Sequence, residues 1–124
     1  MNKLCKRARK GFTLVEIMIV VLIIGILLAI AVPNFIRARE TSRAKSCVAN
    51  LKQIESAKEQ WAMDNKKNAT DTPTTAELYG ADKYLKTEPI CPSGGDYVEG
   101  NMATRPTCSI GVNGADPSDD HVLP

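Results

Sequence analysis

A long apolar stretch follows a short basic one near the N-terminus. Residues 17–32 contain no polar side chain, and residues 1–11 hold five basic side chains and no acidic one. A helix over residues 12–32, at ~1.5 Å rise per residue, would cover about 30 Å, the thickness of the hydrocarbon core of a bilayer. The pattern predicts a membrane-spanning helix. The basic residues before it predict a cytoplasmic N-terminus and export of the rest of the chain.

A second helical pattern follows in residues 34–67. Apolar residues recur there at steps of three and four, which places them on one helical face: Ala44, Cys47, Val48, Leu51, Ile54, Ala57 and Trp61. The charged residues are expected mainly on the remaining surface: Lys45, Lys52, Glu55, Lys58, Glu59 and Asp64. Pro33 lies between the two patterns, where it removes one backbone donor and clashes with the preceding turn. We therefore expect one long helix from about residue 12 to about residue 66, kinked near Pro33.

Residues 68–124 hold most of the glycine, proline and aspartate of the chain. Thr74 and Glu77 form a T-x-x-E pair that is soon followed by a glycine, which predicts a short helix. Short strands are expected around residues 97–99 and 108–110, because both segments adjoin glycine-rich turn signals. The expected fold is α+β, with a long kinked N-terminal helix packed on a small region that holds a short helix and a few short antiparallel strands in a β-hairpin.

The charge distribution limits the classes of function. The 16 basic and 14 acidic residues give a net charge of +2, but five of the basic residues lie within the first ten positions. The remainder has 11 basic and 14 acidic residues, or −3. This balance argues against a nucleic-acid-binding protein. His121 is the single histidine of the chain, so the usual catalytic side chains are nearly absent and we expect no enzyme.

Glu16 is the one charged residue within the apolar stretch. A carboxylate costs roughly 2.5 to 3.5 kcal/mol near the centre of a bilayer, and less near its edge, so it needs a cationic partner. Cleavage after Gly11 would create a new ammonium group on Phe12, four residues away, that could neutralise Glu16 of an adjacent copy. Gly11 suits a protease that requires a residue without a side chain before the cut.

The sequence of residues 10–16, Lys-Gly-Phe-Thr-Leu-Val-Glu, between a basic leader and an apolar helix, resembles the type III signal of the type IV pilin and type II secretion pseudopilin superfamily. The resemblance covers residues 1 to about 61. It implies that prepilin peptidase cleaves between Gly11 and Phe12 and methylates the new amine of Phe12. It also implies that Glu16 pairs with the terminal amine of a neighbouring subunit during assembly.

This resemblance implies a pilin, a structural subunit that is inserted in the bacterial inner membrane as a precursor and then polymerises into an extracellular filament of the type IV pilus kind. The implied partners are the membrane before assembly, other copies of the chain, prepilin peptidase, an inner-membrane assembly platform and a motor ATPase. Apolar residues of the N-terminal helix would be buried against neighbouring subunits: Leu14, Ile17, Ile19, Val20, Ile23 and Leu27. Gly25 and Pro33 match a glycine and a proline that bound a stretch of helix which loosens in assembled filaments.

The implied organisation has four segments. They are a leader removed by prepilin peptidase (1–11), a transmembrane and filament-core helix (12–33), an amphipathic helix (34–67) and a small exported region (68–124). Two other interpretations remain open. One is a pseudopilin or minor pilin of a periplasmic piston like that of type II secretion, and the other is a secreted protein whose ordinary signal peptide is cleaved after Ala31.

The cysteines add an expectation about the exported region. Cys5 would leave with the leader, and Cys91 and Cys108, which flank a turn-rich segment of an exported and therefore oxidised region, are expected to form a disulfide. A disulfide-closed loop is similar to that of many pilins, whereas major pseudopilins generally lack one, so it favours a pilin. Cys47 is expected as a buried free thiol. A zinc site is disfavoured, because C-x-x-C spacing is missing and His121 is remote in sequence.

Asp116, Asp119 and Asp120 crowd the C-terminal loop. Some members of the resembled family hold calcium in this region, and carboxylate oxygens at such spacing could bind Ca²⁺. The spacing is not that of an EF-hand, and acidic side chains in solvent are the commoner outcome. No other cofactor is expected.

Overall fold

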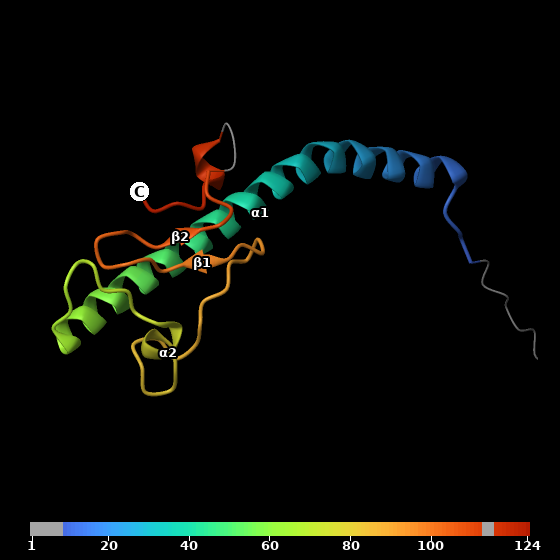
Figure 1. The fold of residues 1–124 in the computed structure, drawn as a ribbon. Coiled ribbons are helices and arrows are strands. Elements are labelled where there is room, and N and C mark those ends of the chain that lie inside the picture. Colours follow the sequence, from blue (N-terminus) through green and yellow to red (C-terminus); the bar gives the residue numbers. More distant parts are fainter. Residues whose placement is uncertain (1–8, 113–115) are drawn as a thin grey trace, which may run out of the picture. The chain divides into compact units, whose positions relative to one another are not determined.

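The structure is a computed structural model that describes residues 9–112 and 116–124. Most of the predicted leader, residues 1–8 with Cys5, lies outside the described residues. The described elements follow one another in the order α1 (Leu14–Asn65), α2 (Thr75–Leu78), β1 (Tyr97–Val98), β2 (Thr107–Cys108) and the 3₁₀ helix η1 (Pro117–Asp119) (Figure 1). The expected α+β class, with a long N-terminal helix, a short second helix and an antiparallel strand pair, is confirmed.

Helix α1 begins with a capping box. The backbone N–H and the hydroxyl of Thr13 donate hydrogen bonds to Oε2 of Glu16 at 2.7 and 3.1 Å. The hydroxyl oxygen of Thr13 in turn accepts one from the backbone N–H of Glu16 at 3.3 Å. These bonds satisfy backbone donors that have no partner inside the first turn of a helix. The helix therefore starts where threonine stands three residues before glutamate.

The expected interruptions do not end α1. The helix runs for 52 residues and continues through Gly25 and Pro33, so the loosening expected between them in filaments stays a prediction. It ends where Lys66 adopts the left-handed backbone conformation, with φ 50°. The N–H of Lys67 then donates to the carbonyl of Ala62 at 3.0 Å, which closes the helix with a Schellman-type bond.

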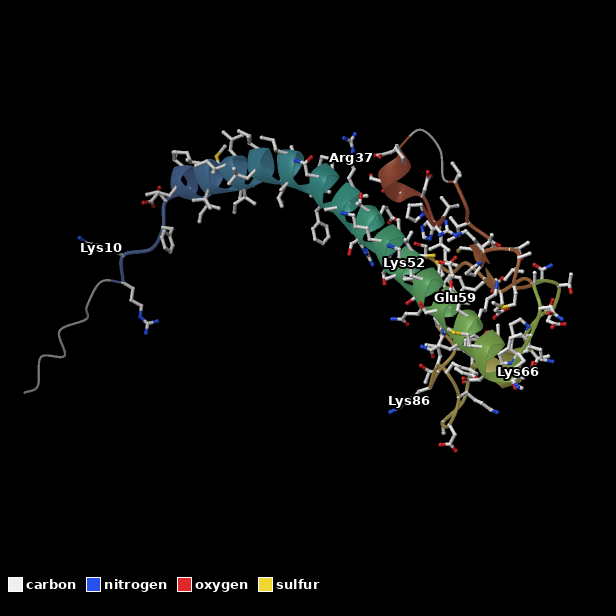
Figure 2. The ribbon with its side chains drawn as sticks, turned by 90° about the vertical axis from the view of Figure 1, so that its left-hand side faces the viewer. Lys10, Arg37, Lys52, Glu59, Lys66 and Lys86 are labelled. Carbon is white, nitrogen blue, oxygen red and sulfur yellow. The ribbon has the colours of Figure 1, made fainter. Side chains whose placement is uncertain are left out.

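The chain divides into two compact units, residues up to Ile36 and Arg37–Pro124. In the first unit, every described side chain is exposed, and these side chains are drawn as sticks in Figure 2. Helix α1 contains a window of mean hydropathy 3.2 and is, by length and composition, able to cross a membrane. In water, so much exposed apolar surface would be unfavourable, so this unit needs a bilayer or neighbouring chains around it.

In the second unit, the apolar face of α1 forms one side of the core. All of the residues expected on this face are buried except Val48, which is half-buried. One cluster joins Cys47 and Leu51 to Cys91 and Cys108. A second cluster joins Ala57, Trp61 and Leu78. The period of three and four residues therefore predicted the packed face correctly.

Strands β1 and β2 form the only sheet among the described residues. They are antiparallel, with Tyr97 opposite Cys108 and Val98 opposite Thr107. The sheet lies along the half of α1 that carries Cys47 (Figure 1). The expected hairpin is confirmed, although each strand has two residues rather than three.

The structure corrects the expectation that Lys58 lies on the exposed surface of α1. Lys45, Lys52, Glu59 and Asp64 are exposed as expected, and Lys52 and Glu59 can be found on α1 in Figure 2. Lys58 is instead 2% exposed. Its ammonium group donates to backbone carbonyls of the loop that connects β1 and β2, and these acceptors compensate for the loss of water.

The predicted cap of α2 forms in the structure. The backbone N–H and the hydroxyl of Thr74 donate to Oε2 of Glu77 at 2.8 and 2.9 Å. These hydrogen bonds favour the ionised carboxylate and lower the pKa of Glu77 below its ordinary value of 4.5.

We expect Glu77→Gln to reduce the acid sensitivity of the second unit. A carboxylate with a lowered pKa in the fold contributes stability that is present above its unfolded pKa of 4.5 and is lost as pH falls through the folded value. Urea unfolding of the full chain in detergent micelles, followed by the fluorescence of Trp61, should therefore show a smaller fall in stability between pH 6 and about pH 3 for the variant. Equal falls in both proteins would contradict this role.

Candidate functional site

The residues of the predicted cleavage site lie immediately before α1. Gly11 and Phe12 are exposed, and Phe12 is 86% exposed. A Cβ atom added to Gly11 would meet no atom within 4 Å. The fold therefore places no constraint of its own that requires glycine at this position, and a requirement for glycine would come from an enzyme that binds the site.

Glu16 has a local partner that the sequence interpretation missed. The carboxylate was expected to need a cation from another copy, yet Thr13 of the same chain donates two hydrogen bonds to its Oε2 atom. A carboxylate has a second oxygen, so Oε1 can still accept a hydrogen bond from an ammonium group. The signal that would have found this partner is T-x-x-E, the same pair of residue types that predicted the cap of α2.

The residues expected to bury against neighbouring subunits are all exposed in the isolated chain. Leu14 is 78% exposed and Leu27 is 61% exposed, and the others are close to half exposed: Ile17, Ile19, Val20 and Ile23. One apolar hollow on this helix is lined by Phe12, Glu16, Ile17, Ile19 and Val20. The structure therefore brings the predicted new N-terminus and the acidic residue to one hollow.

The cysteines form a different arrangement from the one expected. Cys47, Cys91 and Cys108 are free and buried in the structure, so the predicted Cys91–Cys108 disulfide is not present in it. Their sulfur atoms and a ring nitrogen of His121 all lie within 4.8 Å of one another. His121 is remote from Cys47 and Cys91 in sequence, yet the fold of the C-terminal segment brings it beside them.

Burial and hydrogen bonds act differently on the sulfur atoms. Burial raises the pKa of the Cys47 thiol to about 12, and a hydrogen bond with the hydroxyl of Tyr97 opposes this rise. Burial also raises the pKa of Cys91, but hydrogen bonds from the backbone N–H groups of Ser93 and Gly95, together with those of the Cys47 and Cys108 thiols, outweigh it, so the net shift is downward. The loop after Cys91 therefore stabilises a thiolate at that position.

Two of the three aspartates of the calcium expectation have other roles. Asp116 accepts a hydrogen bond from the backbone N–H of Ser118 at 2.9 Å and so caps η1. Asp119 accepts one from the hydroxyl of Thr41 at 3.0 Å. Among the residues that the structure describes, the carboxylates of Asp116, Asp119 and Asp120 do not form a group of possible metal ligands. The calcium prediction therefore rests on the sequence alone.

Comparison with known proteins adds a family context. Residues 6–32 match the profile of the prokaryotic N-terminal methylation motif. The chain is 30% identical to the type II secretion system core protein G of Klebsiella michiganensis over 132 aligned positions, which cover 94% of this chain and 93% of that protein.

Two further relatives show how far the likeness extends. The chain is 33% identical to the type II secretion system core protein G of Escherichia coli K12, over 73% of this chain and 70% of that protein. It is 35% identical to the competence protein ComGC of Bacillus subtilis, over 68% of this chain and 83% of that protein. Because these alignments cover two thirds or more of this chain, the likeness extends well beyond the N-terminal motif. No solved structure gives a significant match.

Proposed function

Because the chain belongs to the type IV pilin and type II secretion pseudopilin superfamily, we propose that it is a pseudopilin, a structural subunit of a periplasmic filament. The observation that carries this proposal is the combination of the N-terminal methylation motif with an apolar helix whose side chains are all exposed. Such a helix suits a chain that is held first by a bilayer and then by copies of itself. The proposed role is assembly and not catalysis.

The choice of a pseudopilin over a pilus subunit follows from the relatives of the chain. Two of the three relatives described above are core proteins of type II secretion systems. They favour the alternative interpretation of the sequence over the extracellular pilus.

The proposed mechanism begins in the inner membrane, where the apolar half of α1 anchors the precursor. Prepilin peptidase cleaves between Gly11 and Phe12 and methylates the new amine. That amine then pairs with Glu16 of a neighbouring subunit, and the apolar side chains pass from lipid to protein neighbours. Because lipid tails already surround these side chains, the gain from packing is modest, and a motor ATPase on an assembly platform is expected to drive the transfer.

Processing can be tested with the full precursor, expressed in a bacterium together with prepilin peptidase. We expect mass spectrometry to find a mature chain that starts at N-methylated Phe12. Gly11→Leu should leave the precursor uncleaved, because a bulky side chain then precedes the cut. Gly25→Ala is the matched control, since a Cβ atom at Gly25 would meet nothing within 4 Å. A mature chain that starts at Val32 would overturn the proposal in favour of an ordinary signal peptide.

The type of filament needs a separate experiment in the native bacterium. An antibody against the chain should label short periplasmic structures, and sheared surface material should contain little of the protein. Long surface fibres that consist mainly of this chain would instead identify it as a pilus subunit. Electron microscopy and mass spectrometry of the sheared fraction distinguish the two outcomes.

A further inference from the structure

The geometry points to a structural zinc site formed by Cys47, Cys91, Cys108 and His121. The four residues are buried, and their ligand atoms lie within 4.8 Å of one another. Three thiolates and one imidazole are a ligand set that structural zinc sites use, with tetrahedral geometry. This site is independent of whether the chain assembles as a pseudopilus.

The distances are close to those of a tetrahedral zinc ion. With bonds of about 2.3 Å to sulfur and about 2.0 Å to nitrogen, such an ion holds its ligand atoms roughly 3.5 to 3.8 Å apart. The Sγ atom of Cys91 and the Nδ1 atom of His121 are 3.5 Å apart. The other pairs need to move inward by about 1 Å or less, which side-chain rotation can supply.

The four ligands come from four separate segments of the chain. Cys47 lies on α1, Cys91 precedes β1, Cys108 lies on β2, and His121 follows η1. The backbone N–H of His121 donates to the carbonyl of Gly111 at 2.8 Å, which ties the C-terminal segment to the end of the hairpin. A bound ion would therefore connect α1, the segment before β1, strand β2 and the C-terminal segment.

The packing around the sulfur atoms also fits a site with little spare room. Leu51 belongs to the same buried cluster as the cysteines, and Tyr97 and Leu123 pack against it. A Cβ atom on Gly95 would lie 2.6 Å from the sulfur of Cys108. The absence of a side chain at Gly95 thus leaves this sulfur its position beside the other ligands.

A metal ion accounts for the cluster better than a disulfide does. A disulfide would join two of the three sulfur atoms. It would not explain why a third thiol and a buried imidazole lie beside them. The small core of this region offers little stability by itself, since each strand has only two residues, and a structural metal is a common supplement in small domains. The sequence does not show the usual C-x-x-C signature of a zinc site, because no two of the ligands lie in the same turn of the chain.

The test uses the full chain in detergent micelles, expressed in zinc-supplemented medium and purified with a phosphine reductant. We expect elemental analysis to find one zinc ion per chain, and removal of zinc by a chelator should lower the unfolding midpoint reversibly. Cobalt added to the zinc-free chain should give the visible absorption of a tetrahedral thiolate complex. This last measurement needs no variant and so does not depend on whether variants fold.

Variants distinguish zinc from a disulfide. His121→Ala and Cys47→Ser should each lose the zinc. A Cys91–Cys108 disulfide would instead survive both changes and leave the chain two hydrogens lighter in intact mass, which is measured on samples purified without the reductant. Ser46→Ala is the matched control, because Ser46 is exposed beside Cys47, and it should keep the zinc. A zinc-free wild-type chain whose midpoint does not respond to added Zn²⁺, and which gives no cobalt spectrum, would overturn the proposal.

Discussion

Glu16→Ala is expected to reduce filament yield on the order of tenfold or more while cleavage after Gly11 continues. The carboxylate lies in an apolar segment, where an ion pair with the amine of a neighbouring subunit would be stronger than in water. In the proposed assembly, loss of that pair removes the charge interaction between neighbouring subunits. The cleavage site itself is unchanged, so the peptidase should still process the variant.

The capping box makes a sharper experiment possible. Thr13 donates two hydrogen bonds to the carboxylate of Glu16. The Glu16→Ala change therefore removes both a helix cap and a negative charge. Glutamine also serves in capping boxes, and Glu16→Gln should therefore keep the cap and remove only the charge. If charge pairing drives assembly, Glu16→Gln should assemble as poorly as Glu16→Ala.

Filament yield is measured by cross-linking in the membrane and by electron microscopy, with the N-terminus of each variant checked by mass spectrometry. Glu40→Gln is the control, because Glu40 is an acidic residue of the same helix that forms a partly exposed ion pair with Arg43 at 3.2 Å. Normal yield from Glu16→Gln combined with poor yield from Glu16→Ala would assign Glu16 to the cap. In that case the charge-pairing step would be wrong.

Local patterns in the sequence were sufficient for much of the fold. The apolar period over residues 44–61 depends only on the geometry of a helix, so it predicted the buried face without knowledge of what packs on it. The T-x-x-E pair at Thr74 and Glu77 likewise involves groups within one turn. The same pair at Thr13 and Glu16 was missed, because a carboxylate in an apolar segment indicates first a missing cation and only second a helix cap.

Features that depend on distant segments could not be predicted in the same way. The four residues of the proposed zinc site lie in four different segments, and spacing rules detect ligands that share a turn or a hairpin. Lys58 lies at a position between core residues of α1, and its burial depends on carbonyl groups of a loop some forty residues later. Hydrophobic periodicity contains no information about such acceptors.

The second large effect is expected at Lys58. Its Nζ atom donates to the carbonyl oxygens of Asn101 and Thr104, both at 2.8 Å, and to that of Glu99. An ammonium group has three N–H donors, so the three acceptors match it completely. Burial lowers the pKa of Lys58, while the carboxylates of Glu55 and Glu99 oppose this shift, and the carbonyl groups also favour the charged form.

Lys58→Met is expected to destabilise the second unit by about 2 to 4 kcal/mol. Methionine is similar in length and apolar, so it fills the space but leaves the carbonyl acceptors without their donor. The free energy of unfolding is measured by urea titration of the full chain in micelles. Trp61 is the single tryptophan of the chain and lies in the core of this unit, so its fluorescence reports the transition.

Two further variants separate the geometry of the site from its charge. Lys52→Met changes an exposed lysine of the same helix and should alter stability by less than about 0.5 kcal/mol. Lys58→Arg keeps the positive charge, but a planar guanidinium cannot direct three donors to three converging carbonyls, so it should also destabilise the unit. If Lys58→Met were as stable as Lys52→Met, water would be replacing the ammonium group, and the loop between β1 and β2 would not depend on it. A destabilised Lys58→Met beside a fully stable Lys58→Arg would mean that the positive charge alone matters, because the three-donor geometry would then be dispensable.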